Sequence, residues 1–105
     1  MDIATHRLAA HALRRAGLWS WQPDAPVTDR WGPIMVADVT FPAARLAVDL
    51  GGSTFPDGRS RAQLRLAAAG WTLASFVRED LERRPSGVAR EIRALLDRLT
   101  PTRYP

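Results

Sequence analysis

Apolar residues along this chain recur with helical periods in some stretches and with strand-like periods in others. Where the period is helical, the expected boundaries carry the usual signals: Gly17 and Gly70 follow two of the stripes, and Asp57 precedes the second stripe as a candidate N-cap. A loose tail is expected at Thr102–Pro105. The expected helices are residues 3–16, 58–69 and 78–84 and a closing stripe from Val88 to Leu99.

Three apolar runs have the length of strands: Ile34–Phe41, Arg45–Leu50 and Trp71–Phe76. A turn around Pro42 joins the first two. Leu46, Val48 and Leu50 alternate with Ala47 and Asp49, so the two sets are expected on opposite faces of a strand. Together with the helices, this order predicts an α/β fold with a mixed β-sheet flanked by helices.

The stretch between the first helix and these strands is rich in tryptophan and proline and breaks the helical period. It predicts an extended segment followed by a turn at Thr28–Gly32. Trp19 and Trp21 share one side of an extended chain, and we interpret them as covering the core. The alternative is that they stack on nucleic-acid bases.

Composition places the chain among ordinary single domains, here residues 1–105, with 46% apolar and 25% charged residues. No apolar run has the length of a membrane span, and the N-terminus lacks the apolar region of a signal peptide. Without cysteine, disulfides and thiolate chemistry are excluded, so the cytoplasm is the expected compartment. All 15 basic residues are arginine, and the net charge of +4 favours an anionic partner.

Each of the two central runs contains one carboxylate, Asp38 in the first and Asp49 in the second. Burying a carboxylate is unfavourable unless it is paired, hydrogen-bonded or bound to a metal. The pair is therefore a candidate metal site, and its structural alternative is that each residue pairs with an arginine or caps a turn. On the expected second helix, Arg61 and Arg65 form a basic strip that could bind phosphates or could be an ordinary solvated face.

The sequence resembles the small nucleases related to the very-short-patch-repair endonuclease, which belong to the PD-(D/E)XK superfamily. The resemblance depends on the order and spacing of several motifs, and it covers nearly the whole chain. The matching residues are Asp38 to Pro42, Arg45 to Asp49, Gly52, Leu66 to Trp71, Phe76 and Asp80-Leu81, with Arg15 to Leu18 resembling the end of the first helix of the family.

This resemblance implies a restriction-endonuclease-like fold and metal-dependent hydrolysis of DNA, in DNA repair or restriction. Asp38 then matches the first metal-binding carboxylate and Asp49 the acid of the (D/E)-x-K element, with the carbonyl of Leu50 as a further ligand. Oxygen ligands of this kind suit Mg²⁺ or Mn²⁺. Arg61 and Arg65 would contact DNA phosphates.

The chain also departs from the family pattern at supporting positions. Gly51 stands where the superfamily has lysine, and Ser75 stands where an arginine often precedes the phenylalanine. Gln63 or an arginine of the following helix could substitute for the lysine. The alternative to an active endonuclease is an inactive nuclease-fold module that binds nucleic acid or a protein. A further alternative is a domain whose partner chain, or second copy, supplies the missing residues.

Overall fold

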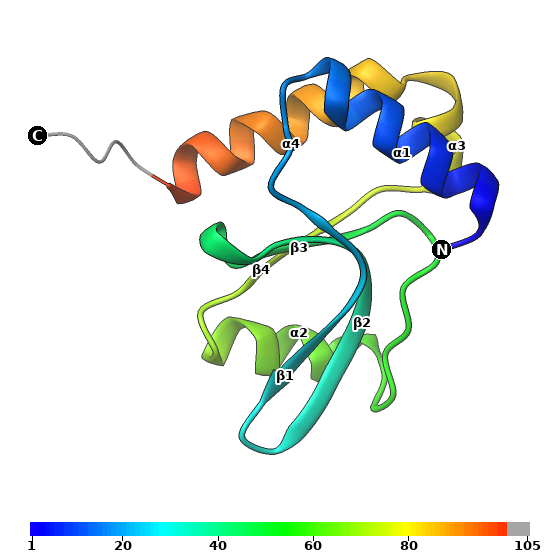
Figure 1. Cartoon of the computed structure of the whole chain (residues 1–105). Helices are drawn as coiled ribbons and strands as arrows, with labels where there is room; N and C mark the ends of the chain where they lie inside the picture. The colour runs from blue at the N-terminus through cyan, green and yellow to red at the C-terminus, as the bar shows by residue number, and fades with distance from the viewer. Residues whose placement is uncertain (101–105) are drawn as a thin grey trace, which may run out of the picture.

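A four-stranded mixed sheet forms the centre of the protein, with the strands in the order β1-β2-β3-β4 (Figure 1). The computed structural model describes residues 1–100, so the tail Thr102–Pro105 lies outside the described residues. β1, β2 and β3 are antiparallel neighbours, whereas β4 is parallel to β3. The elements are α1 (Ile3–Arg15), β1 (Gln22–Asp29), β2 (Gly32–Phe41), a 3₁₀ turn (Pro42–Ala44), β3 (Leu46–Asp49), α2 (Arg59–Ala68), β4 (Thr72–Ser75), α3 (Arg78–Arg83) and α4 (Pro85–Leu99).

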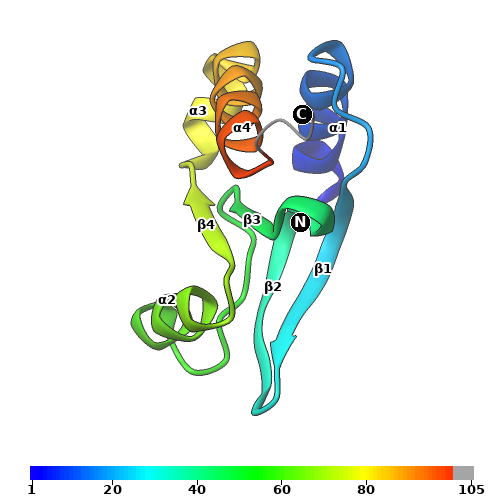
Figure 2. The ribbon, with the colours of Figure 1, turned by 90° about the vertical axis from the view of Figure 1, so that its left-hand side faces the viewer.

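Helices cover both faces of this sheet: α1, α3 and α4 lie on one face and α2 on the other (Figure 2). A parallel strand pair needs a crossover connection, and α2 provides it between β3 and β4. The mixed α/β architecture expected from the sequence is therefore confirmed. Within residues 1–100, none of these helices is long and apolar enough to cross a lipid bilayer.

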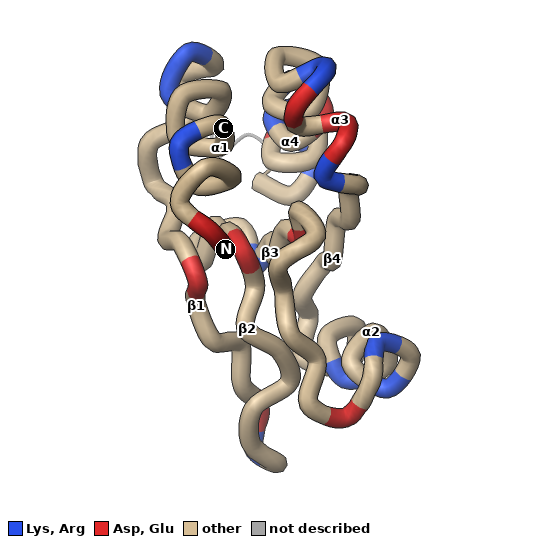
Figure 3. Tube along the Cα trace, turned by 90° about the vertical axis from the view of Figure 1, so that its right-hand side faces the viewer, with Lys and Arg blue, Asp and Glu red and all other residues tan. Residues whose placement is uncertain are grey.

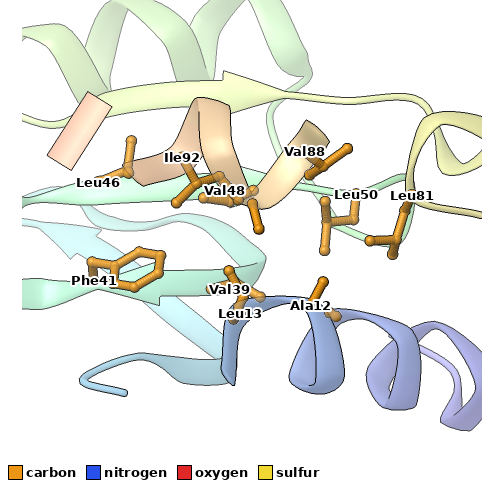
Figure 4. Packing of buried hydrophobic residues seen from close by; sticks show 12 residues of the cluster. Ala12, Leu13, Val39, Phe41, Leu46, Val48, Leu50, Leu81, Val88 and Ile92 are labelled. Atoms are coloured by element: carbon orange, nitrogen blue, oxygen red, sulfur yellow. The ribbon is translucent and has the colours of Figure 1, made fainter. Parts of the chain in front are cut away.

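Two hydrophobic clusters result, one on each face. The alternation along β3 is as expected, because Leu46, Val48 and Leu50 belong to the first cluster and Ala47 to the second. Ala62 and Leu66 of α2 complete the smaller cluster. Figure 4 shows side chains of the larger cluster, which include Leu13, Val39, Phe41, Leu46, Val48, Leu50, Leu81, Val88 and Ile92.

Two local expectations are wrong. Trp19 does not cover the core: its side chain is 67% exposed, and the guanidinium of Arg14 lies 5.8 Å from the centre of its ring. Only Trp21 packs against the larger cluster, because residues 18–21 precede β1 and have no strand partner that would impose alternation. Asp57 does not cap α2, since Gly58 is the N-cap residue and forms no side-chain capping bond.

Candidate functional site

The carboxylate of Asp38 fills a gap between β2 and β3. Pairing of the two strands ends at Val39 and Val48, and β2 next pairs with Thr54, beyond the intervening loop. Across this gap, Oδ2 of Asp38 accepts hydrogen bonds from the backbone amides of Leu50 at 2.6 Å and Gly52 at 2.9 Å. The side chain is fully buried. Asp38 thus satisfies the amides of Leu50 and Gly52, which the interrupted ladder leaves without a carbonyl partner.

The other oxygen of Asp38, Oδ1, is buried and accepts no hydrogen bond from any residue among 1–100. The amino group of Met1 forms a long ion pair with it, at 3.9 Å. Gly52 lies so close that an added Cβ would stand 2.6 Å from Oδ1. The glycine is therefore required here for a close approach to the carboxylate.

Asp49 is held by an ion pair. Arg59, the first residue of α2, donates to Oδ2 of Asp49 at 2.7 Å, and the amide of Gly51 donates to Oδ1 at 3.0 Å. Burial raises the pKa of Asp49, but hydrogen bonds from Arg59, Gly51 and Ser53 outweigh it and hold that pKa below its usual range. Asp49 therefore stays ionised at neutral pH.

The guanidinium of Arg59 is positioned by two further contacts. It donates to the hydroxyl of Ser75 in β4 at 3.2 Å and lies 4.4 Å from the ring centre of Phe55. The sequence left open that an arginine of the following helix takes the place of the missing lysine at Gly51. Arg59, on that helix, is such an arginine. The sequence did not single it out, because nothing distinguishes it from the other arginines of the helix except its place as the first residue of α2.

Asp38 precedes Val39 and Asp49 follows Val48, so on the antiparallel strands β2 and β3 the two predicted site carboxylates lie at the same end of the pairing. Ser53 interacts with both. Its hydroxyl donates to Oδ2 of Asp38 at 3.1 Å and contributes to the lowered pKa of Asp49. Each carboxylate also has the partner that the structural alternative requires, a turn for Asp38 and an arginine for Asp49.

This donor set does not fit Mg²⁺ or Mn²⁺ as arranged. Three of the four carboxylate oxygens already accept hydrogen bonds, which leaves Oδ1 of Asp38. Residues 1–100 contain no group of three or more histidine, cysteine, aspartate or glutamate side chains that could hold a metal ion. The nitrogen that Leu50 contributes here is an amide donor to Asp38, and a role for its carbonyl as a ligand stays a prediction. Mg²⁺ requires six oxygen ligands in octahedral geometry, and this arrangement provides too few.

Arg65 of the predicted basic strip is engaged inside the protein. It donates two hydrogen bonds to Asp29, at 2.5 and 3.1 Å, one to Asp57 at 3.2 Å, and two to the carbonyls of Gly32 and Pro33. These bonds use all five N–H groups of a guanidinium. The hydrogen bond from Arg65 lowers the pKa of Asp29 below its usual range. Arg65 thus ties α2 to the hairpin of β1 and β2 and has no N–H left for a phosphate.

Arg61, one turn earlier on α2, is exposed and has no ion-pair or hydrogen-bond partner in the described part of the chain. It lines an open hollow of about 440 Å³ together with Trp31, Asp57 and Arg65. Trp31, at the hairpin tip, is 77% exposed, and the guanidinium of Arg30 lies 5.3 Å from the centre of its ring. The sequence interpretation missed Trp31, although a tryptophan inside a predicted turn has little core to pack against.

Comparison with protein-family models, with curated proteins and with solved structures finds no match. The relationship to the PD-(D/E)XK nucleases thus stays a prediction from the motifs of the chain itself.

Proposed function

We propose that this protein is a nuclease-like domain that binds DNA through the tip of the β1–β2 hairpin and α2 without hydrolysing it. The observation that carries this proposal is the hollow lined by the exposed ring of Trp31 and by Arg61, whose guanidinium has no partner within residues 1–100. An exposed tryptophan can stack on a base of any sequence, and an unpaired arginine can contact a phosphate. The excess of arginine over acidic residues across the whole chain supports an anionic partner.

The absence of hydrolysis in this proposal follows from the contacts of the two carboxylates. Arg59 neutralises Asp49, and the loop amides occupy Oδ2 of Asp38. Activation of water by a metal ion needs carboxylate oxygens that are free to coordinate it. The pair therefore has a structural role here, in which it joins β2, β3 and the start of α2.

A metal-dependent DNA endonuclease that uses Mg²⁺ or Mn²⁺ is the second candidate. It is favoured by Oδ1 of Asp38, which accepts no hydrogen bond within residues 1–100, and by the position of both carboxylates at the same end of adjacent strands. This function requires Arg59 to leave Asp49. The side chain of Arg59 is 49% exposed, so it has room to do so.

DNA binding by wild type and by a Trp31→Ala, Arg61→Gln double variant tests the proposed interface. We expect the double variant to bind a fluorescein-labelled single-stranded oligonucleotide about tenfold more weakly or worse, since one stacked base alone contributes about 1–3 kcal/mol. The measurement is fluorescence anisotropy over a range of salt concentrations. Affinity for the wild type should fall steeply as salt rises, because bound phosphates release counterions.

The matched control is a Trp19→Ala, Arg14→Gln double variant, which removes an exposed tryptophan and one positive charge on another part of the surface. We expect it to bind DNA as the wild type does. Equal losses in both double variants would show that the hollow is not the binding site. A wild type that fails to bind DNA at low ionic strength would exclude nucleic acid as the partner and favour a protein partner or a second copy of the chain.

A further inference from the structure

A basic cleft lies between α1 and α4. Both helices pack on the face of the sheet opposite α2 (Figure 2). Its volume is about 390 Å³, and Arg15 of α1 and Arg90 and Arg93 of α4 contribute to its lining. An adjoining hollow of about 280 Å³ shares Arg15 and adds His11. The floor consists of small residues, which leave space between the two helices: Ala12, Ala16 and Ala89.

The arginines of this cleft lack acidic partners. Arg15 and Arg90 form no ion pair or hydrogen bond within residues 1–100, and Arg93 donates only to the carbonyl of Ala16 at the end of α1. The lining of the cleft contains no described acidic residue. Elsewhere on the molecule several arginines are neutralised, as Arg84 is by Asp80 and Glu91. The tube view shows basic positions on both α1 and α4, the helices that flank the cleft (Figure 3).

We propose that the cleft between α1 and α4 binds a ligand through a phosphate group. Three guanidinium groups around one concavity repel each other, and a multivalent anion relieves that repulsion. The planar N–H fork of arginine matches the oxygens of a phosphate and can bind it in a bidentate manner. The cleft has the size of a small-ligand site, which commonly has about 300–1,000 Å³. This proposal is independent of the DNA interface at Trp31 and Arg61.

Calorimetric titration with inorganic pyrophosphate tests the cleft. We expect saturable binding to the wild type and a loss of about tenfold or more in an Arg15→Gln, Arg90→Gln double variant, because each charge-assisted hydrogen bond contributes substantially. Arg93 is left unchanged because its bond to Ala16 also joins the two helices. The control is Arg7→Gln with Arg98→Gln, which removes the same charge from exposed positions of the same helices outside the cleft. It should bind pyrophosphate as the wild type does.

A second arm identifies the source of the phosphate, with a short single-stranded oligonucleotide as the probe. If the cleft takes a phosphate of the nucleic-acid backbone, the Arg15, Arg90 variant binds the oligonucleotide more weakly than the Arg7, Arg98 control, and pyrophosphate competes with it. If the cleft takes a free phosphate-bearing molecule, the variant loses only pyrophosphate. Both results support the site. The proposal is overturned if the two variants bind pyrophosphate and the oligonucleotide equally.

Discussion

Replacement of Asp38 with Ala is expected to lower the free energy of unfolding by about 3–5 kcal/mol, because each buried donor left without a partner costs about 1–3 kcal/mol. The amides of Leu50 and Gly52 and the hydroxyl of Ser53 all donate to the carboxylate that this change removes. Asp38 is fully buried, and its bond to the amide of Leu50 is the most enclosed of the three, since those to Gly52 and Ser53 are partly buried. Urea denaturation followed by circular dichroism measures the effect. A small domain has a total stability of about 5–15 kcal/mol, so this loss is a large fraction of the total.

Asp38→Asn is the matched control for this experiment. The carbonyl oxygen of asparagine can still accept from the amides of Leu50 and Gly52, so most of the stability should return. An Asp38→Ala variant that is as stable as the wild type would show that the carboxylate does not hold the two strands and the loop together.

Replacement of Arg65 with Met is expected to lower Tm by about 5–10 °C, because it removes the hydrogen bonds that connect α2 with the hairpin. Arg61→Met is the control, since Arg61 lies on the same helix and is exposed without a partner in the described chain. It should change Tm very little. Equal effects of the two changes would contradict the assignment of Arg65 to the hairpin connection and of Arg61 to the surface.

The stabilising effect of Arg65 should also depend on pH. Its hydrogen bond holds the pKa of Asp29 below the usual range in the folded protein. Stability from such a depressed pKa is fully present above the unfolded value of about 3.9 and is lost as pH falls through the folded value. The difference in stability between wild type and Arg65→Met should therefore be constant near neutral pH and shrink in acid. A difference that stays constant into strong acid would contradict the ionic contribution.

Local patterns in the sequence predict most of the helices and strands of this fold. The alternation along 45–50 predicts the two faces of β3, and the apolar stripe from Val88 predicts α4. Trp19 is different, because alternation determines burial only in a strand with partners, and residues 18–21 have none. The strand β1 was predicted only as an extended segment, because proline is unusual in a strand. Pro23 and Pro26 are tolerated there because β1 is an edge strand.

The candidate site could be located from the sequence, but its contacts could not. Asp38 and Asp49 are conspicuous because carboxylates are rare inside apolar strands. Their actual partners depend on the conformation of the loop after β3, where Gly51 has a φ of +96° and Gly52 approaches Asp38 closely. Arg65 was grouped with Arg61 by its spacing on one helix, whereas its partner Asp29 is 36 residues away in the sequence. Such a pairing becomes visible only when the hairpin and α2 are placed together.

The most direct test of a DNA-binding domain that does not cut DNA is to measure both properties on one supercoiled plasmid, with Mg²⁺ and with Mn²⁺. The expected result for the wild type is a salt-dependent shift of the plasmid with no nicked or linear product, and the same pattern for Asp49→Asn. Asp49→Asn is preferred to Asp38→Ala because it keeps the buried contacts of Asp38. Metal-dependent nicking by the wild type that Asp49→Asn abolishes in a folded protein would contradict the proposal and establish the endonuclease.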